Sequence, residues 1–275
     1  MTRSDLDALR RYRAWQTPSK SVTDLDSAVQ MLNDTGFLLP WRRRGIDLPT
    51  WRDAYPYPVE REPGPIWRWK EVVPQQRKGF YGKVLRRGPC VVSLECLPCF
   101  YALAQRAGER EEYLYSYQMG RLSSVAKQVM DSLIAHWPLS TYELRDRLLL
   151  KTREGHATLN RALDELQATM FACMVMASDE EDREYTYYWA PVDEAFPCSV
   201  RQAQDISSVD AARALVSRYV KTMVFSPRSY PVWLLGLSER TYDKALLLAR
   251  DGGHLVIEES LDGLPGPWLI TTSLK

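Results

Sequence analysis

Histidines, paired metal ligands and phosphate-binding loops are scarce in this sequence. The three histidines, at positions 136, 156 and 254, fall in different segments, which argues against a catalytic nucleophile–histidine pair. There is no glycine-rich phosphate loop, so the sequence does not support nucleoside triphosphate hydrolysis. The five cysteines include one C-x-x-C motif, Cys96–Cys99, but no second pair to complete a zinc site. We therefore expect no metal, no cofactor, and thiols that are reduced and mostly buried.

Apolar stretches long enough to cross a membrane are also missing, since none approaches the roughly 18–20 residues required. The first residues, Met1–Asp5, contain no hydrophobic segment of the kind found in a secretory signal. We expect a cytoplasmic protein without a membrane partner. Its 45% hydrophobic and 26% charged residues are typical of a folded chain, and 275 residues allow two or three small domains.

One pattern occurs twice, 83 residues apart. Residues 161–175 and 244–258 each read as an amphipathic helix that ends in a short apolar strand. A polar turn and a second strand follow each copy, at Tyr185–Val192 and Trp268–Ser273, and two helical stretches precede each copy. Three helices and a hairpin are the pattern of a winged helix.

The predicted fold is therefore mainly α with small β-hairpins, an α+β protein containing tandem winged-helix units. We place the units at residues 123–200 and 205–275, after a basic, Trp/Pro-rich helical region at 1–122, for which a further winged-helix-like unit is the alternative. Residues Asp24, Ser140 and Ser238 are predicted helix N-caps, and Ser140 with Glu143 resembles a capping box.

Positive charge is concentrated near the N-terminus. Residues 1–90 contain 17 Lys/Arg against 10 Asp/Glu, whereas the remaining 185 residues contain 19 against 25. The strongest cluster is Arg42, Arg43 and Arg44, and three adjacent arginines favour a phosphate partner. A solvated loop is the alternative. The pairs Arg77-Lys78 and Arg86-Arg87 extend this basic character.

Residues 37–82 are dense in proline, tryptophan and arginine, and seven prolines predict an ordered but irregular segment without long helices. Within it, Trp67-Arg68-Trp69-Lys70-Glu71 would, as a strand, place both tryptophans on one face and the charges on the other. The tryptophans would then stack on an exposed base while Arg68 and Lys70 hold phosphates. The alternative is a core tryptophan pair with solvated charges.

Several segments together resemble the AlkZ/YcaQ family, and its divergent AlkZ-related branch most closely, over roughly residues 80–275. They are Phe80–Gly82, Ser93–Pro98, Leu144-Arg145, Arg161–Gln167 and Phe196-Pro197. Members of this family are bacterial DNA glycosylases with tandem winged helices, which unhook interstrand crosslinks and remove alkylated purines. The resemblance implies duplex DNA, damaged or undamaged, as the partner and base excision repair as the process.

The catalytic signature of that family is an N-terminal Gln-apolar-Gln or Gln-apolar-Asp tripeptide, and residues 1–60 contain neither. Gln202-Ala203-Gln204 matches the pattern but lies between the two predicted winged units. Without the tripeptide, the candidate catalytic groups are Asp47, Glu71 and Gln75.

The turn of the first predicted wing, Asp179–Glu184, contains five acids and one base, and the second turn contains Asp262 and no base. Phosphates would repel such turns, so we expect both wings to point away from any bound DNA. Two alternatives to a glycosylase follow. One is a non-catalytic winged-helix DNA-binding or regulatory protein, and the other is a protein-interaction module with acidic wings.

Overall fold

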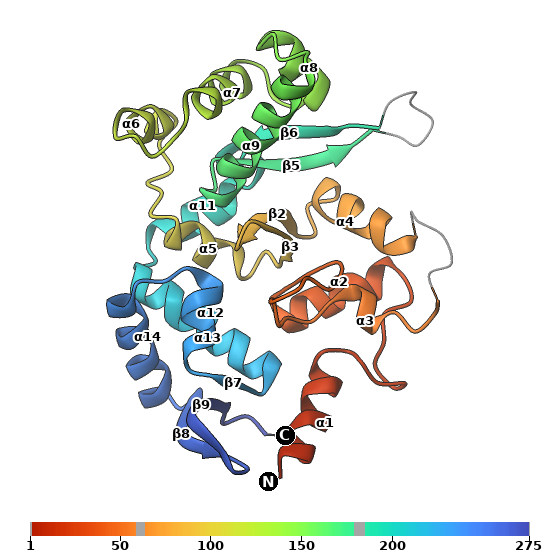
Figure 1. The fold of residues 1–275 in the computed structure, drawn as a ribbon, viewed down its shortest axis with the longest axis vertical. Coiled ribbons are helices and arrows are strands. Elements are labelled where there is room, and N and C mark those ends of the chain that lie inside the picture. Colours follow the sequence, from red (N-terminus) through yellow and green to blue (C-terminus); the bar gives the residue numbers. More distant parts are fainter. Residues whose placement is uncertain (1, 59–63, 179–184, 275) are drawn as a thin grey trace.

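Helices and three small antiparallel sheets alternate along the chain in this computed structural model, which describes residues 2–58, 64–178 and 185–274 (Figure 1). The predicted α+β class is confirmed. The order helix, strand, helix, helix, strand, strand occurs three times, and we call these the first, second and third repeats. The acidic turn 179–184 lies outside the described residues.

The first repeat comprises α2 (Leu25–Thr35), β1 (Phe37–Leu38), α3 (Trp51–Ala54), α4 (Pro65–Gln75), β2 (Phe80–Leu85) and β3 (Gly88–Val92). The second comprises α7 (Ser124–Ala135), β4 (Leu139–Ser140), α8 (Thr141–Arg147), α9 (Arg153–Ala168), β5 (Ala172–Ala177) and β6 (Tyr187–Pro191). The third comprises α12 (Ser208–Met223), β7 (Phe225–Pro227), α13 (Ser229–Leu235), α14 (Glu239–Asp251), β8 (Leu255–Leu261) and β9 (Leu264–Thr271).

Among the residues that the structure describes, five helices lie outside the repeats: α1 (Arg3–Arg13), α5 (Leu97–Leu103), α6 (Glu112–Gln118), α10 (Val192–Ala195) and α11 (Pro197–Gln204). The three sheets share one topology, in which the last strand of the repeat lies between the other two: β1-β3-β2, β4-β6-β5 and β7-β9-β8. The two helix-to-strand segments expected from the sequence are α9 with β5 and α14 with β8.

Local capping explains where several helices begin. Asp24, Ser140 and Ser238 each accept a hydrogen bond from a backbone N–H in the first helical turn, as predicted. At Ser140 the capping box is complete, because the Glu143 carboxylate accepts from the Ser140 N–H at 2.7 Å. Strands β2 and β3 pair as an antiparallel hairpin.

The expectation that prolines exclude long helices from residues 37–82 is wrong for α4, which has eleven residues. Pro65 lies in its first turn, where the backbone N–H has no partner within the helix, so proline is tolerated there. Pro74 lies in the last turn. Helix α5 begins at Leu97, with Pro98 in its first turn, and ends at Leu103.

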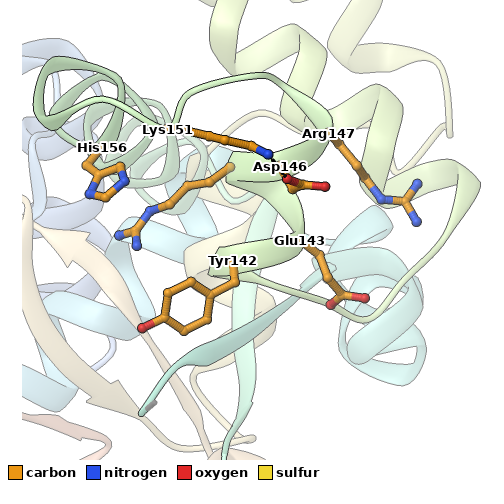
Figure 2. Close-up of a pocket in the computed structure, with 7 residues that line it drawn as sticks. Tyr142, Glu143, Asp146, Arg147, Lys151 and His156 are labelled. Atoms are coloured by element: carbon orange, nitrogen blue, oxygen red, sulfur yellow. Dashed lines mark ion pairs between the residues drawn. The ribbon is translucent and has the colours of Figure 1, made fainter. Parts of the chain in front are cut away.

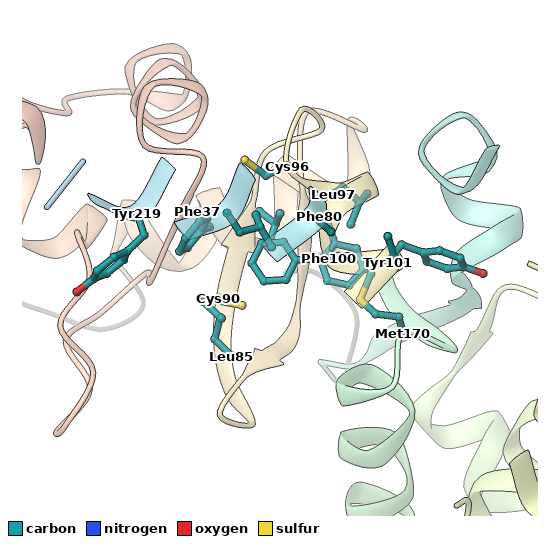
Figure 3. Packing of buried hydrophobic residues seen from close by; sticks show 14 of the residues in the cluster. Phe37, Phe80, Leu85, Cys90, Cys96, Leu97, Phe100, Tyr101, Met170 and Tyr219 are labelled. Carbon is teal, nitrogen blue, oxygen red and sulfur yellow. The ribbon is translucent and has the colours of Figure 1, made fainter. Parts of the chain in front are cut away.

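A continuous apolar core joins the three repeats (Figure 3). Phe37 and Phe80 come from the first repeat, Met170 and Cys173 from the second, and Tyr219 from the third. Helix α5 lies among them and contributes Phe100, whose ring meets that of Phe37 edge to face at 5.4 Å.

Helix α1 packs on the third repeat, although it is distant in sequence (Figure 1). Leu6 is buried with Val224, Phe225 and Leu261, and the Arg13 guanidinium donates to the Lys221 carbonyl at 2.6 Å. Both chain ends therefore belong to the same part of the molecule. Within the described residues, no helix combines the length and apolarity needed to cross a membrane.

Candidate nucleic-acid interface

The three adjacent arginines lie on the loop between β1 and α3. A bridge between Arg43 and Ile46 closes a tight turn, in which Gly45 adopts a φ of 81°. Further along, Leu39 pairs with Thr50, so both ends of the loop are fixed to the fold. The loop is ordered by its own backbone hydrogen bonds, and its arginine side chains remain exposed.

The arginines of this loop differ in how much of their charge is already paired. Arg42 is 80% exposed, and its Nε lies 2.6 Å from the Asp53 carboxylate. Arg43 and Arg44 form no ion pair with any residue that the structure describes. Arg43 instead lies against the backbone of Gly88, where an added Cβ would lie 1.9 Å from its Nη1. A side chain at position 88 would displace the end of the exposed Arg43 side chain.

Gly88 follows the tight turn of the β2–β3 hairpin, which consists of Arg86 and Arg87. Both have positive φ values, 48° and 53°, which residues other than glycine and asparagine rarely adopt. The Arg86 guanidinium lies 4.7 Å from the centre of the Trp233 ring on α13. We call Arg42, Arg43, Arg44, Arg86 and Arg87 the arginine surface.

A cavity of about 470 Å³ opens beside this surface. Five arginines and three aspartates line it, namely Arg10, Arg11, Arg42, Arg43, Arg44, Asp7, Asp47 and Asp53, so the ionised side chains leave two positive charges in excess. Asp47 pairs with Arg10, and its backbone N–H donates to the Tyr230 hydroxyl. The excess charge suits a phosphate-bearing ligand.

The strand expected at Trp67–Glu71 is wrong, because these residues belong to helix α4. The two tryptophans therefore lie on different faces. Trp69 is buried, 5% exposed, against Trp51 and Tyr55, while Trp67 is half-buried next to Trp41. Trp69 offers no surface for stacking on a base. Arg68 is exposed, and its predicted phosphate contact stays a prediction.

Lys70 is only 2% exposed, which corrects its assignment as a phosphate contact. Its Nζ lies 3.8 Å from the Trp67 ring centre and 4.9 Å from that of Tyr187, and it donates to Glu71 Oε1 at 2.9 Å and to the Tyr187 hydroxyl. The Tyr185 hydroxyl donates to the same Glu71 oxygen. Burial raises the pKa of Tyr185 above its ordinary value, so the phenol keeps its proton.

The basic pair after α4, Arg77-Lys78, also makes contacts within the protein. Arg77 donates to the Ala195 carbonyl at 2.8 Å and lies over the Phe196 ring, and Lys78 lies 3.6 Å from the Asp26 carboxylate. Arg77 thus links α4 to the segment after the second repeat. Gln75 is exposed at the end of α4.

The three candidate catalytic groups are not brought together. Asp47 lies in the arginine-lined cavity, Glu71 lies among the tyrosines, and Gln75 lies one helical turn beyond Glu71. The Gln202-Ala203-Gln204 tripeptide forms the end of α11, where Ala203 is buried and Gln204 donates to the Ala107 carbonyl at 3.3 Å. Its contacts are those of a packed helix end.

The C-x-x-C motif contributes to packing at α5. Burial raises the pKa of Cys99 to about 11 and also raises that of Cys96, so both remain protonated thiols near neutral pH. In the described part of the chain, no three His, Cys, Asp or Glu side chains gather in a group that could hold a metal ion.

Sequence reasoning missed a basic cavity of about 670 Å³ at the turn between α8 and α9 (Figure 2). Arg145, Arg147, Lys151 and His156 line it, and Lys151 pairs with Asp146. The Arg145 guanidinium lies 5.4 Å from the Tyr142 ring centre, and its buried Nε has no hydrogen-bond partner among the described residues. The run of cations between residues 145 and 156 was the available signal.

Together, the three repeats and the cationic cavity define a modular helix–sheet protein with a basic face formed largely by its first repeat. The chain belongs to the AlkZ-related family, whose model matches residues 22–226. This match confirms the resemblance, but it begins in the first repeat, well before the expected residue 80.

One solved structure shows the same fold, the Streptomyces sahachiroi DNA glycosylase AlkZ. The TM-score is 0.59 at 13% sequence identity, over 99% of this chain and 70% of that chain. No curated protein matches the sequence.

Proposed function

We propose that this protein binds duplex DNA and acts as a DNA glycosylase-like repair protein on alkylated or crosslinked purines. The arginine surface and its cavity carry the proposal, because Arg43 and Arg44, which form no ion pair with the described residues, lie on an ordered loop beside the hairpin turn of Arg86 and Arg87. Membership of the AlkZ-related family and the fold shared with a DNA glycosylase support the same reading.

Each repeat is, in this proposal, a winged helix, with its hairpin as the wing and its third helix as the recognition helix. The second and third repeats fall within the predicted units 123–200 and 205–275, and the first falls within residues 1–122. Charge distinguishes the wings. The wing turn of the first repeat is Arg86-Arg87, whereas that of the third repeat contains Asp262 and no cation. The wing of the first repeat is therefore the one that faces the phosphates.

The enzymatic part of the proposal is tested with a duplex that contains a single N7-alkylguanine, or a nitrogen-mustard crosslink, at enzyme excess. We expect the alkylated base to be released, leaving an abasic site that alkali cleaves at the lesion. An unmodified duplex of the same sequence is the control. If the protein bound the lesion duplex tightly but formed no abasic product, the proposed glycosylase activity would be refuted and the proposed DNA binding would stand.

The second candidate is a non-catalytic DNA-binding or regulatory protein of the same fold. The pairing of the candidate carboxylates favours it, because Asp47 is held by Arg10, and Glu71 by Lys70 and Tyr185. A carboxylate held in this way is less available to activate water than a free one. The same assay separates the two candidates.

A further inference from the structure

A cavity distinct from the arginine-lined one lies where the first and second repeats meet. Its volume is about 360 Å³, within the roughly 300–1,000 Å³ of small-molecule sites. Aromatic rings from three elements line it: Tyr81 from β2, Tyr142 from α8, and Tyr187 and Trp189 from β6, with Tyr185 just before β6. Such a wall suits a flat, aromatic ligand.

These rings are held in fixed orientations. The Tyr185 and Tyr187 rings meet edge to face with centres 5.4 Å apart, and the Trp189 indole N–H donates to Thr141 Oγ1 at 2.9 Å. Behind the wall, Lys70 contacts Tyr187 through both its ring and its hydroxyl, and Glu71 accepts from Tyr185. The buried Lys70–Glu71 pair therefore acts on the cavity by positioning two of its tyrosines.

The opposite side of the cavity is polar and comes from one face of α9. Asn160, Asp164 and Gln167 lie at i, i+4 and i+7, which places them in a row along the helix. Asp164 pairs with Lys83 of β2, and the Gln167 amide nitrogen donates to the Leu163 carbonyl at 3.1 Å. Asn160 is exposed, and its amide makes no hydrogen bond within the described part of the chain.

From this arrangement we propose that the cavity binds a single nucleobase. The tyrosines stack on its faces, and the amide of the exposed Asn160 pairs with its hydrogen-bonding edge. Aromatic walls combined with a few edge-reading polar groups are what a base removed from a helix requires. The proposal rests on the proposed function only for the source of the base, which is either an unstacked nucleotide of a DNA strand or a free nucleoside.

Both sources are tested with 2-aminopurine, a fluorescent base whose emission falls when it stacks on aromatic rings. In one arm the free riboside is titrated with the protein. In the other, the affinity for a duplex carrying 2-aminopurine opposite an abasic site is compared with that for the fully paired duplex. The variants are Tyr142→Ala and Asn160→Ala. The controls are Tyr117→Ala, similarly exposed on α6, and Asn33→Ala, exposed on α2.

We expect the wild type to prefer the duplex with the unpaired base. Tyr142→Ala should reduce this preference about tenfold, the loss expected on removing one stacking ring. Asn160→Ala should also reduce the preference for the unpaired base. Both control variants should keep the wild-type preference, and all four variants should bind the fully paired duplex with wild-type affinity. Saturable quenching of the riboside by the wild type, diminished in the two variants, would identify the free nucleoside as a ligand too.

The nucleobase pocket would be refuted if Tyr142→Ala and Asn160→Ala both kept the preference for the unpaired base. It would also be refuted if the wild type neither preferred that duplex nor quenched the riboside. In either case, binding of the fully paired duplex would leave the proposed DNA-binding function standing. If the protein bound no duplex but quenched the riboside in a manner that depends on Tyr142, the pocket would stand and the DNA-binding proposal would fall.

Discussion

Aromatic faces and oxygen atoms replace the water around the buried Lys70 side chain. The Trp67, Tyr81 and Tyr187 rings surround its ammonium group, and Glu71 and the Tyr187 hydroxyl accept its hydrogen bonds. Its position two residues from Arg68 suggested a surface cation, because residues i and i+2 lie on the same face of a strand. A helix turns about 100° per residue, which separates the two side chains.

The capping box at Ser140 gives a prediction at the residue scale. The backbone N–H of Ser140, and then its side chain, hold the pKa of Glu143 below its ordinary value. A lowered pKa in the folded state stabilises the fold above the unfolded pKa of about 4.3, and this stabilisation is lost as pH falls through the folded value. Glu143→Ala should therefore lower the free energy of unfolding by about 1 kcal/mol at pH 7 and by much less near pH 3.

Urea denaturation at the two pH values measures this difference. Glu154→Ala is the matched control, since Glu154 is also an exposed glutamate in the first turn of a helix, but makes no capping hydrogen bond. Equal losses for Glu143→Ala at both pH values would show that the carboxylate charge plays no part.

At the scale of elements, the hairpin turn of the first repeat combines strain with charge. Arg86 and Arg87 occupy the two central turn positions, which favour asparagine and glycine. A residue other than glycine in this left-handed region costs of order 1–3 kcal/mol, and such strain is found where function requires the side chain. The strain is consistent with a role for these arginines outside folding.

Arg87→Gly should raise the free energy of unfolding by about 1 kcal/mol, because it relieves strain at position 87 and leaves the contact of Arg86 with Trp233 intact. The same change should weaken duplex binding. Arg87→Ala is the control, since it removes the charge but keeps the strained backbone, and should weaken binding without stabilising the fold. Thermal unfolding and duplex titration of both variants test the pair of effects. A Gly variant no more stable than the Ala variant would contradict the strain argument.

Elements whose signals are local could be predicted, and those that depend on distant partners could not. The caps at Asp24, Ser140 and Ser238 follow from a few adjacent residues, and so do the helices they begin. Helix α4 was missed because its prolines lie at its two ends, where they are tolerated. The burial of Lys70 depends on Tyr187, which is 117 residues away in sequence, and no local pattern reveals that contact.

On the scale of the whole molecule, the first repeat lies at the centre of the arrangement. Its β2 strand and α4 helix contact the second repeat, while Arg86 and the loop of residues 42–47 reach side chains of the third. The arginine surface therefore lies where the first repeat meets the third, and the aromatic cavity where it meets the second. The C-x-x-C motif at α5 and the Gln202–Gln204 tripeptide of α11 belong to two helices that pack against each other.

The salt dependence of duplex affinity tests the central claim, that the arginine surface contacts DNA phosphates. Each phosphate neutralised contributes about −0.9 to the slope of log affinity against log salt concentration. Replacing Arg42, Arg43 and Arg44 with alanine should make the slope less steep by roughly 2–3 units, with Arg42 contributing least because Asp53 already pairs with it. Replacing Arg110, Arg121 and Arg201, exposed elsewhere, should leave it unchanged. A wild-type slope in the first triple variant would contradict the account.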